Sequence, residues 1–337
     1  MDVRDLGEFG LIDRLARALG APADERLIVG IGDDAAVWRA GDAYVIGTTD
    51  TMVAGVHFLP DRVSWRDVGW KALAVNVSDI AAMGGAPSFA LVTLGVPPDT
   101  AVAALDELYA GVRECAEAYH VTVSGGDIVS SPVFTVTVAL MGEALVSGGA
   151  PLLLRRDAAR PGDLIAVTGP LGGSAGGLRA LLEGTQLEHP SLVEAHMRFW
   201  PRVDAGDIAV RAGIRCGIDI SDGLVQDLGH ICEASKVHAE LRLDRVPLDD
   251  DLVLAYPQEA ASIAATGGED YELILVGPRG AIELADGALR RQLVMPDTEQ
   301  LTIVGEIMTG EANVCVLDAS GREVTFETGG WDHLRRR

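Results

Sequence analysis

Strand and helix signals alternate along the first half of the chain. Strands are predicted at 44–50, 88–96, 120–124 and 133–140, helices at 64–83 and 100–118, and a turn at 125–127. Ser64 with Asp67 three residues later indicates where the first helix begins, and Gly84-Gly85 with Pro87 beyond indicates where it ends. Alternation of this kind is typical of a sheet covered by helices.

The alternation begins again after residues 144–163, a segment rich in Gly and Pro. The second half is predicted to contain strands at 164–169, 214–220, 238–243, 271–276 and 302–307 and helices at 174–184, 203–212 and 223–235. A length of 337 residues, 48% of them hydrophobic, suits two domains. The sequence therefore predicts an α+β fold of two α/β domains, at 1–145 and 150–337, each packing a sheet against helices.

The chain is strongly acidic, with a formal net charge of -23 from 50 acidic and 27 basic residues. Nucleic acid is therefore not an expected partner. A protein of this charge repels phosphate polyanions unless metal cations lie between them, so a nucleotide substrate is expected to bind through divalent ions. Most of the acidity is explained by solubility or by a salty cytoplasm, and only a few carboxylates need a functional explanation.

The N-terminus and the cysteines predict a cytoplasmic protein that does not enter a membrane. The first residues, MDVRDLGEFGLIDRL, lack the basic region and apolar run of a signal peptide, and no stretch reaches about 18 consecutive apolar residues. The four cysteines form no C-x-x-C pair and have no histidine at zinc spacing. We expect them to be reduced and structural.

Neither common phosphate-binding loop fits this chain. No G-x-x-x-x-G-K-[ST] motif exists, because neither Lys71 nor Lys236 follows a glycine. Residues 30–35 satisfy the loose dinucleotide pattern G-x-G-x-x-[GA], but Asp33 and Asp34 would lie against the pyrophosphate, which is electrostatically unfavourable without a metal. If ATP binds, it binds in another way.

Aspartates at strand ends and turns are the candidates for chemistry. Asp33, Asp34 and Asp50 are also explained as ordinary turn residues. Asp79 is harder to explain, because it and Asn76 form a polar pair on one face of an otherwise apolar helix, where they either cost stability or face a site.

The segment Asp219-Ile220-Ser221-Asp222-Gly223 lies between a predicted strand and a predicted helix. Capping explains Ser221 and Asp222 as well as catalysis does. Capping does not explain Asp219, which lies within the predicted strand, where aspartate is disfavoured. The Gly-rich residues 168–177 are either a phosphate-binding turn or a flexible one.

Taken together, six aspartates at turns and strand ends of both halves suit a set of Mg²⁺ ions that bridge protein and polyphosphate. They are Asp33, Asp50, Asp79, Asp127, Asp219 and Asp222.

Eight segments resemble, in order and spacing, those of the thiamine-monophosphate kinase family. They are GEFGLIDRL, GIGDDAAV, TTDTMVAGVHF, GWKALAVNVSDIAAMGGAP, SGGDIV, GIDISDGLVQDL, GGEDYEL and GGWDHL, from Gly7 to about Leu334. That family belongs to the superfamily of aminoimidazole ribonucleotide synthetase and selenophosphate synthetase. The resemblance implies mixed sheets in both domains, with ATP, Mg²⁺ and dimerisation assigned to the N-terminal domain, and an active site between the domains of a homodimer.

The resemblance also implies roles for individual residues. Metal ligands would be Asp33, Thr48, Thr49, Asp50, Asp79, Asp127, Asp219 and Asp222, of which Asp50, Asp79 and Asp222 would be catalytic. ATP contacts would come from Tyr109, Gly126, Asp127, Arg156 and Ser221, with Arg155 as an alternative to its neighbour. Thiamine phosphate would meet His57, Glu269 and Trp331.

The implied reaction is in-line transfer of the γ-phosphoryl group of ATP to the phosphate of thiamine monophosphate. Selenophosphate synthetase is disfavoured, because its reactive Cys and Lys near the N-terminus are absent: the first lysine is Lys71 and the first cysteine is Cys115. A relative active in hydrogenase maturation and a catalytically silent nucleotide- or cation-binding scaffold remain alternatives.

Overall fold

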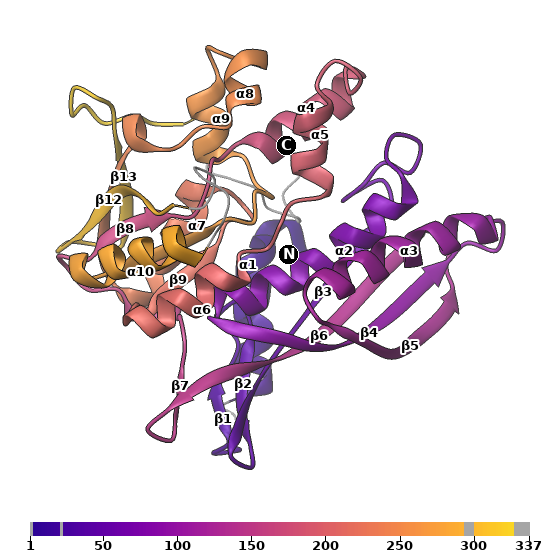
Figure 1. The fold of residues 1–337 in the computed structure, drawn as a ribbon, viewed down its shortest axis with the longest axis horizontal. Coiled ribbons are helices and arrows are strands. Elements are labelled where there is room, and N and C mark those ends of the chain that lie inside the picture. Colours follow the sequence, from indigo (N-terminus) through magenta and orange to yellow (C-terminus); the bar gives the residue numbers. More distant parts are fainter. Residues whose placement is uncertain (1–2, 21–22, 293–299, 327–337) are drawn as a thin grey trace.

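The computed structural model describes residues 3–20, 23–292 and 300–326. Two mixed sheets, each packed against helices, form an α+β fold (Figure 1). The strands are β1 (Leu27–Val29), β2 (Ala36–Ala40), β3 (Ala43–Val53), β4 (Gly85–Val96), β5 (Thr122–Ser130), β6 (Thr135–Ser147), β7 (Ala150–Leu152), β8 (Leu164–Val167), β9 (Cys216–Asp219), β10 (His238–Arg242), β11 (Leu273–Gly277), β12 (Thr302–Met308) and β13 (Asn313–Leu317). The helices are α1 (Val3–Leu19), α2 (Trp65–Ala82), α3 (Val102–Ala118), α4 (Gly173–Glu183), α5 (Pro190–Met197), α6 (Val203–Ala212), α7 (Leu224–Ser235), α8 (Asp250–Ala255), α9 (Ala260–Thr266) and α10 (Arg279–Gln292), with 3₁₀ turns at Arg156–Ala158 and Leu243–Arg245.

The first sheet has the order β1-β2-β3-β6-β4-β5, with β7 paired to β6. Helix α2 packs against β3, β6 and β4 on one face, and α3 packs against α2 (Figure 1). The outer part of the sheet is less covered: in β5 every residue except Val123 is exposed. One face of this sheet therefore forms the core and the other faces outward.

The second sheet has the order β13-β10-β12-β8-β11-β9 and is covered on both faces. Alternate residues of β8 belong to different clusters: Ile165 and Val167 pack with α7 residues, whereas Leu164 and Ala166 pack with α6 and α10 residues. This explains why β8 is a continuous apolar run rather than an alternating one. Helix α6 also contacts α2, so it joins the two layers.

Helix α2 lies at the centre of the molecule because of its composition. Fourteen of its 18 residues are buried. Its start is as predicted, since the Ser64 side chain caps the helix by accepting a hydrogen bond from the Asp67 backbone N–H at 3.0 Å. A buried central helix carries its few polar side chains into the interior, where they need partners.

Several predicted elements are confirmed within a few residues, and one prediction is wrong. Residues 125–127 do not form a turn but lie within β5, which pairs in parallel with β4. Glycine is needed for this pairing, because a β-carbon on Gly126 would lie 1.7 Å from the carbonyl oxygen of Val92. The register also shifts beside Gly125, as in a β-bulge. Among the described elements, α1, α5, α8, α9, α10, β1, β2, β7 and β13 were not predicted.

No helix in the described ranges is both long and apolar enough to cross a membrane.

Candidate active site

Three carboxylates from distant parts of the chain meet between the two sheets. Asp34 lies just before β2, Asp79 lies on α2, and Asp219 ends β9. One oxygen of each lies within 4.8 Å of the other two. Asp34 Oδ2 is buried and has no hydrogen-bond partner among the described residues. We call these three residues the carboxylate triad.

The carboxylate triad is electrostatically unfavourable by itself. Burial raises the pKa of Asp79 well above its ordinary value, and the charges of Asp50, Asp219 and Asp34 raise it further. Burial and the neighbouring Asp34 raise the pKa of Asp219 to about 8. Hard divalent cations such as Mg²⁺ prefer oxygen ligands and would neutralise this charge. The donor set therefore fits magnesium.

Hydrogen bonds between α2 and its neighbours β3 and β9 hold Asp79 and Asp219 in place. The Thr48 hydroxyl donates to Asp79 Oδ2 at 2.5 Å, and Asn76 Oδ1 accepts from the Asp50 backbone N–H at 3.1 Å. Ser78 donates to Asp219 Oδ2 at 2.5 Å, across the two domains. The polar pair noted in the sequence thus faces the site, with its partners satisfied.

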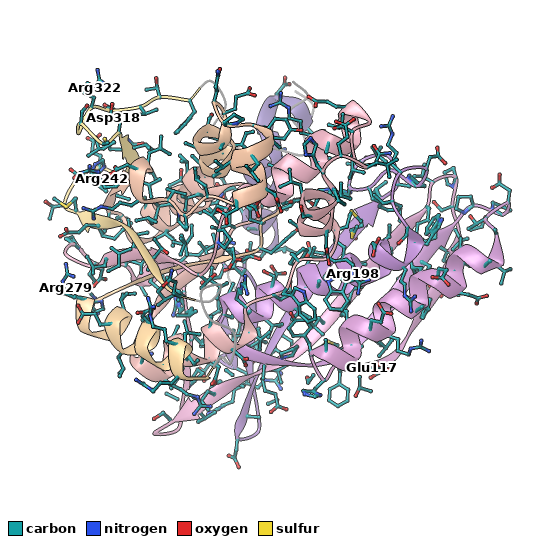
Figure 2. All side chains as sticks on the ribbon, turned by 45° about the horizontal axis from the view of Figure 1, so that its top comes forward. Glu117, Arg198, Arg242, Arg279, Asp318 and Arg322 are labelled. Carbon is teal, nitrogen blue, oxygen red and sulfur yellow. The ribbon has the colours of Figure 1, made fainter. Side chains whose placement is uncertain are left out.

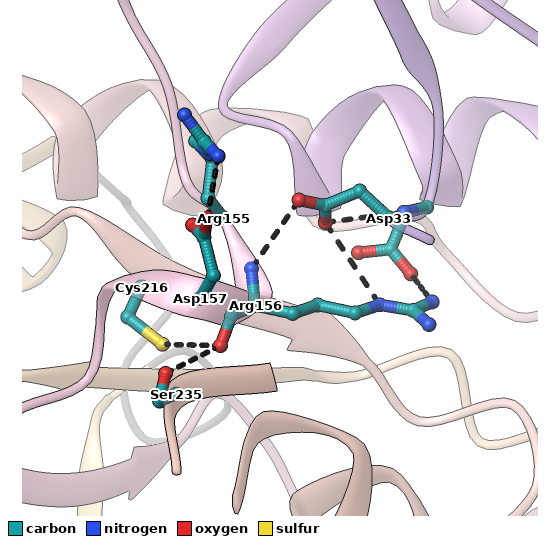
Figure 3. Close-up of polar contacts among 7 residues, drawn as sticks. Asp33, Arg155, Arg156, Asp157, Cys216 and Ser235 are labelled. Carbon is teal, nitrogen blue, oxygen red and sulfur yellow. Dashed lines mark hydrogen bonds and ion pairs between the residues drawn. The ribbon is translucent and has the colours of Figure 1, made fainter. Parts of the chain in front are cut away.

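The Arg156 side chain points toward Asp33, whereas Arg155 pairs with Asp157 instead (Figure 3). The Arg156 guanidinium forms an ion pair with Asp34 and lies 3.8 Å from Asp33 Oδ1. Arg155 instead pairs with Asp157 at 2.5 Å. Burial and the charge of Asp34 raise the pKa of Asp33 to about 7, although Arg156 opposes the shift. Of the two arginines, Arg156 is the one that lies beside the carboxylate triad.

A second group of ligand atoms lies at the start of α7. Oxygens of Asp222 and Asp227 and a ring nitrogen of His230 lie within 4.8 Å of one another. Asp227 Oδ2 accepts the backbone N–H groups of Asp222 and Gly223, both at 3.0 Å. The helix N-cap is Gly223, so the interpretation of Ser221 as an N-cap is wrong.

Glu269 reaches the site from a strained loop before β11. Glu269 and Tyr271 have φ angles of 65° and 51°, in a region that few non-glycine residues adopt. The Glu269 N–H donates to the Ser221 carbonyl at 2.8 Å, which ties this loop to the one that carries Asp222. Burial raises the pKa of Glu269, but the charge and the hydrogen bond of Lys71 lower it by more, so the net shift is downward.

His57 is near enough to Glu269 for its charge to influence the Glu269 pKa, so these two predicted substrate residues lie in one region. His57 Nδ1 accepts the Val53 backbone N–H at 3.0 Å, which fixes the orientation of the ring. Trp331, the third predicted substrate residue, lies outside the described residues.

Four predicted ligands are not brought to the carboxylate triad within one chain. Asp127 on β5 is in register with Thr51 on β3, with β4 and β6 between them. Three strand spacings therefore separate Asp127 from β3, a distance of about 14 Å. Gly126 precedes it on the same edge strand. Tyr109 lies on α3 beside a cavity of about 590 Å³ next to β5. Thr49 faces away from Thr48, and its hydroxyl donates to the Val138 carbonyl on the outward face.

Two backbone amides of the Gly-rich residues 168–177 are bound by a side chain of the protein itself. The Asp270 carboxylate accepts from the backbone N–H groups of Gly172 at 2.7 Å and Ser174 at 3.1 Å. Burial raises the Asp270 pKa to about 7. The segment is therefore not a flexible turn at Gly172 and Ser174, which Asp270 holds in place.

Three residues of these groups were not singled out as ligands from the sequence. Asp34 was treated as a turn residue beside Asp33, although only Asp34 belongs to the carboxylate triad. Asp227 and His230 lie three residues apart, on one face of α7, a spacing that could have indicated them.

The chain matches two family models in sequence order. Residues 32–144 match the N-terminal domain of AIR synthase related proteins, and residues 160–292 match the C-terminal domain.

Curated relatives cover nearly the whole chain. It is 37% identical to the thiamine-monophosphate kinase of Bacillus subtilis (strain 168), over 91% of this chain and 94% of the relative. It is also 37% identical to that of Escherichia coli (strain K12), over 97% of this chain and 98% of the relative.

Solved structures agree with this similarity. A structure described as AaThiL complexed with AMPPCP and TMP matches with a TM-score of 0.84 and 34% identity, covering 99% of both chains. Thiamine monophosphate kinase from Aquifex aeolicus matches with a TM-score of 0.77 and 32% identity, covering 96% of this chain and 99% of the other. A HypE–HypF complex matches with a TM-score of 0.72 but only 18% identity, over 94% of this chain and 99% of that chain, which shows a shared fold alone.

Proposed function

This chain belongs to the thiamine-monophosphate kinase family, and we propose that it phosphorylates thiamine monophosphate to thiamine diphosphate with ATP as the donor. The observation that carries the proposal is the buried carboxylate triad, to which both domains contribute and beside which Arg156 lies. Burying like charges together is costly unless cations bind among them. Such a site suits transfer of a phosphoryl group from ATP to a second, negatively charged phosphate.

The reaction does not require the protein to transfer a proton. The phosphate of thiamine monophosphate has a second pKa of about 6, so at pH 7 its ionised oxygen is itself the nucleophile and no side chain has to accept a proton. Bound Mg²⁺ would supply charge neutralisation between the two polyanions. The residues proposed to hold it are Asp33, Asp34, Thr48, Asp50, Asp79, Asp127, Asp219 and Asp222, whereas the Thr49 hydroxyl is on the opposite face of β3.

The chain's own groups would fix the two substrates. Arg156 already faces carboxylates in the site and would bind phosphate oxygens of ATP, together with Ser221. His57, Glu269 and Trp331 would receive thiamine phosphate, and an aromatic face suits its cationic ring. A cavity of about 590 Å³ beside Tyr109 has the size of a small-molecule site and is proposed to take part of ATP.

Incubation of the purified protein with ATP, Mg²⁺ and thiamine monophosphate is expected to yield thiamine diphosphate and ADP in equal amounts. Chromatographic separation of the thiamine species measures this directly. Omitting Mg²⁺ by adding EDTA is the control, and should stop product formation. ATP consumption with a different acceptor would instead favour a relative such as a hydrogenase-maturation protein, and ATP binding without turnover would favour a silent scaffold.

We further propose that the protein is a homodimer paired through its N-terminal domains, residues 1–145. Large apolar side chains are exposed on neighbouring strands β4 and β5: Phe89 is 54% exposed, Leu91 41% and Ile128 67%. Apolar residues exposed together are typical of an interface. A partner's N-terminal domain would also supply Gly126 and Asp127, which are distant from the carboxylate triad of their own chain, while residues 150–337 complete each site.

Mixing two inactive variants tests this arrangement. Asp50→Asn and Asp127→Asn subunits, unfolded and refolded together, are expected to regain about one quarter of wild-type activity, because half of the dimers are mixed and each mixed dimer has one intact site of two. Each variant refolded alone is the control and should stay inactive. If the mixture is as inactive as the separate variants, Asp50 and Asp127 act within one chain.

We also propose that the protein works in the cytoplasm. All four cysteines, Cys115, Cys216, Cys232 and Cys315, are free thiols. Free thiols suit the reducing conditions of that compartment, where ATP is also available.

A further inference from the structure

Lys71 is a charged residue in an unusual place. It lies in the middle of α2, and its side chain is only 1% exposed. Burying an ammonium group costs several kcal/mol unless partners compensate for the lost water. Burial accordingly lowers the Lys71 pKa, and only Glu269 opposes this shift. The location therefore needs an explanation beyond packing.

The partners of Lys71 come from the other domain. Its Nζ lies 3.3 Å from Glu269 Oε1 and 3.5 Å from His196 Nε2 on α5. His196 is itself buried, and its Nδ1 lies 3.5 Å from Glu269 Oε2 and 2.9 Å from the Ser174 hydroxyl. Both oxygens of Glu269 are thus engaged, one by each residue.

The contacts also determine the state of His196. Burial and the charge of Lys71 lower the His196 pKa to about 3, so its ring is neutral. An ammonium group can only donate, so Nε2 must accept from Lys71 and the ring proton is on Nδ1. That proton faces Glu269 Oε2 and the Ser174 hydroxyl. Lys71 therefore donates to Glu269, whereas the Nδ1–H of His196 is nearest to the Ser174 hydroxyl at 2.9 Å, with Glu269 Oε2 at 3.5 Å.

Glu269 needs such support because its loop is strained. Its φ of 65° is unfavourable for a residue with a side chain, and Gly268 before it has no room for a β-carbon, which would lie 2.4 Å from the Ser221 carbonyl. The Glu269 side chain remains 28% exposed, so it is accessible while Lys71 is not. A carboxylate held on one side and open on the other is suited to meeting a ligand.

We propose that Lys71 is a positioning residue that, with His196, fixes the Glu269 carboxylate in the orientation and charge state that receives the cationic part of thiamine monophosphate. The inference rests on the proposed function. Lys71 does not touch the substrate: it acts from the N-terminal domain, through Glu269, on a loop of the C-terminal domain. The same contact joins the domains around the site.

The test separates positioning from a structural role. In Lys71→Met the KM for thiamine monophosphate is expected to rise about 10- to 100-fold, as for other residues that hold a ligand-contacting group, with the KM for ATP changed less than about 2-fold. Lys71→Met in a Glu269→Gln background is expected to add nothing to the KM of Glu269→Gln alone, because both changes act through one carboxylate. Calorimetric binding of thiamine monophosphate without ATP should weaken in parallel.

Arg198→Met is the matched control. Arg198 lies just after α5, at the junction of the domains (Figure 2), and pairs with Asp67 at 3.1 Å and Glu114 at 3.0 Å. Its loss should lower the melting temperature and leave both KM values unchanged. If Lys71→Met does not fold, His196→Gln should raise the same KM by a smaller factor.

The outcomes distinguish the two proposals. If the wild type makes no thiamine diphosphate, the proposed function fails and this inference with it. If the wild type is active but Lys71→Met, or in its place His196→Gln, loses only stability and keeps its KM for thiamine monophosphate, the positioning role is overturned while the function stands.

Discussion

Asp79→Asn is expected to abolish turnover and, at the same time, to stabilise the metal-free protein. Turnover should fall at least about 100- to 1,000-fold, because the change removes a negative charge that holds cations where charge must be neutralised. The metal-free protein should gain stability at neutral pH, because burial and three neighbouring aspartates make the Asp79 carboxylate unfavourable in the fold. The asparagine oxygen can still accept from Thr48.

Thermal unfolding in EDTA and in Mg²⁺ measures both effects. For the wild type, one magnesium site at 100 times its Kd adds about 2.7 kcal/mol to the free energy of unfolding. Asp79→Asn should unfold at a higher temperature than the wild type in EDTA and gain much less from Mg²⁺. Asp106→Asn, which removes an exposed charge from α3, is the control and should behave as the wild type. Near-normal turnover of Asp79→Asn at saturating Mg²⁺ would show that the carboxylate triad holds no essential metal.

The stability of the metal-free protein is expected to fall as pH rises from about 6.5 to 8.5. The pKa of Asp33 is raised to about 7 and that of Asp219 to about 8, both chiefly by burial. A carboxyl whose pKa is raised by folding binds its proton more tightly when folded, so its contribution is full at low pH and is lost as pH rises through the folded value. Each such group lowers the free energy of unfolding by about 1.4 kcal/mol per pH unit within its range.

The choice of pH range removes the opposing effect of histidine. Burial lowers the pKa of His196 to about 3 and that of His230 to about 4, so these residues make stability rise with pH, but only up to their unfolded value of about 6.5. Urea unfolding between pH 6.5 and 8.5 in EDTA therefore reports the carboxylates without the histidines, and Lys71, whose pKa burial lowers, acts in the opposite direction to the carboxylates. Saturating Mg²⁺ should weaken the dependence, because bound cations replace the protons at Asp33 and Asp219, whereas Asp270, with a pKa also raised to about 7, keeps its contribution. Stability in EDTA that rises with pH over this range would contradict the assignment.

Local signals in the sequence predicted those elements whose determinants lie within a few residues. Helix α2 begins at Ser64 as predicted, because a capping hydrogen bond to Asp67 requires nothing beyond one turn of helix. Strand β3 was predicted from 44–50, within its observed bounds of Ala43–Val53. The wrong turn at 125–127 has a non-local cause. Its glycines allow the close approach of β4, a strand more than 30 residues earlier in the chain.

The motifs of the sequence identified the family and the polar pair on α2, because residue types and their spacing are local properties. Which carboxylates meet was decided only by the tertiary structure. Asp33 and Asp34 are neighbours with the same chemistry, and both side chains are buried beside Arg156, yet only Asp34 joins Asp79 and Asp219, because adjacent side chains cannot reach the same point. No sequence signal singled out Lys71 as a functional residue. Its role became visible only when packing buried α2 between the sheets and brought the loop of Glu269 to its ammonium group.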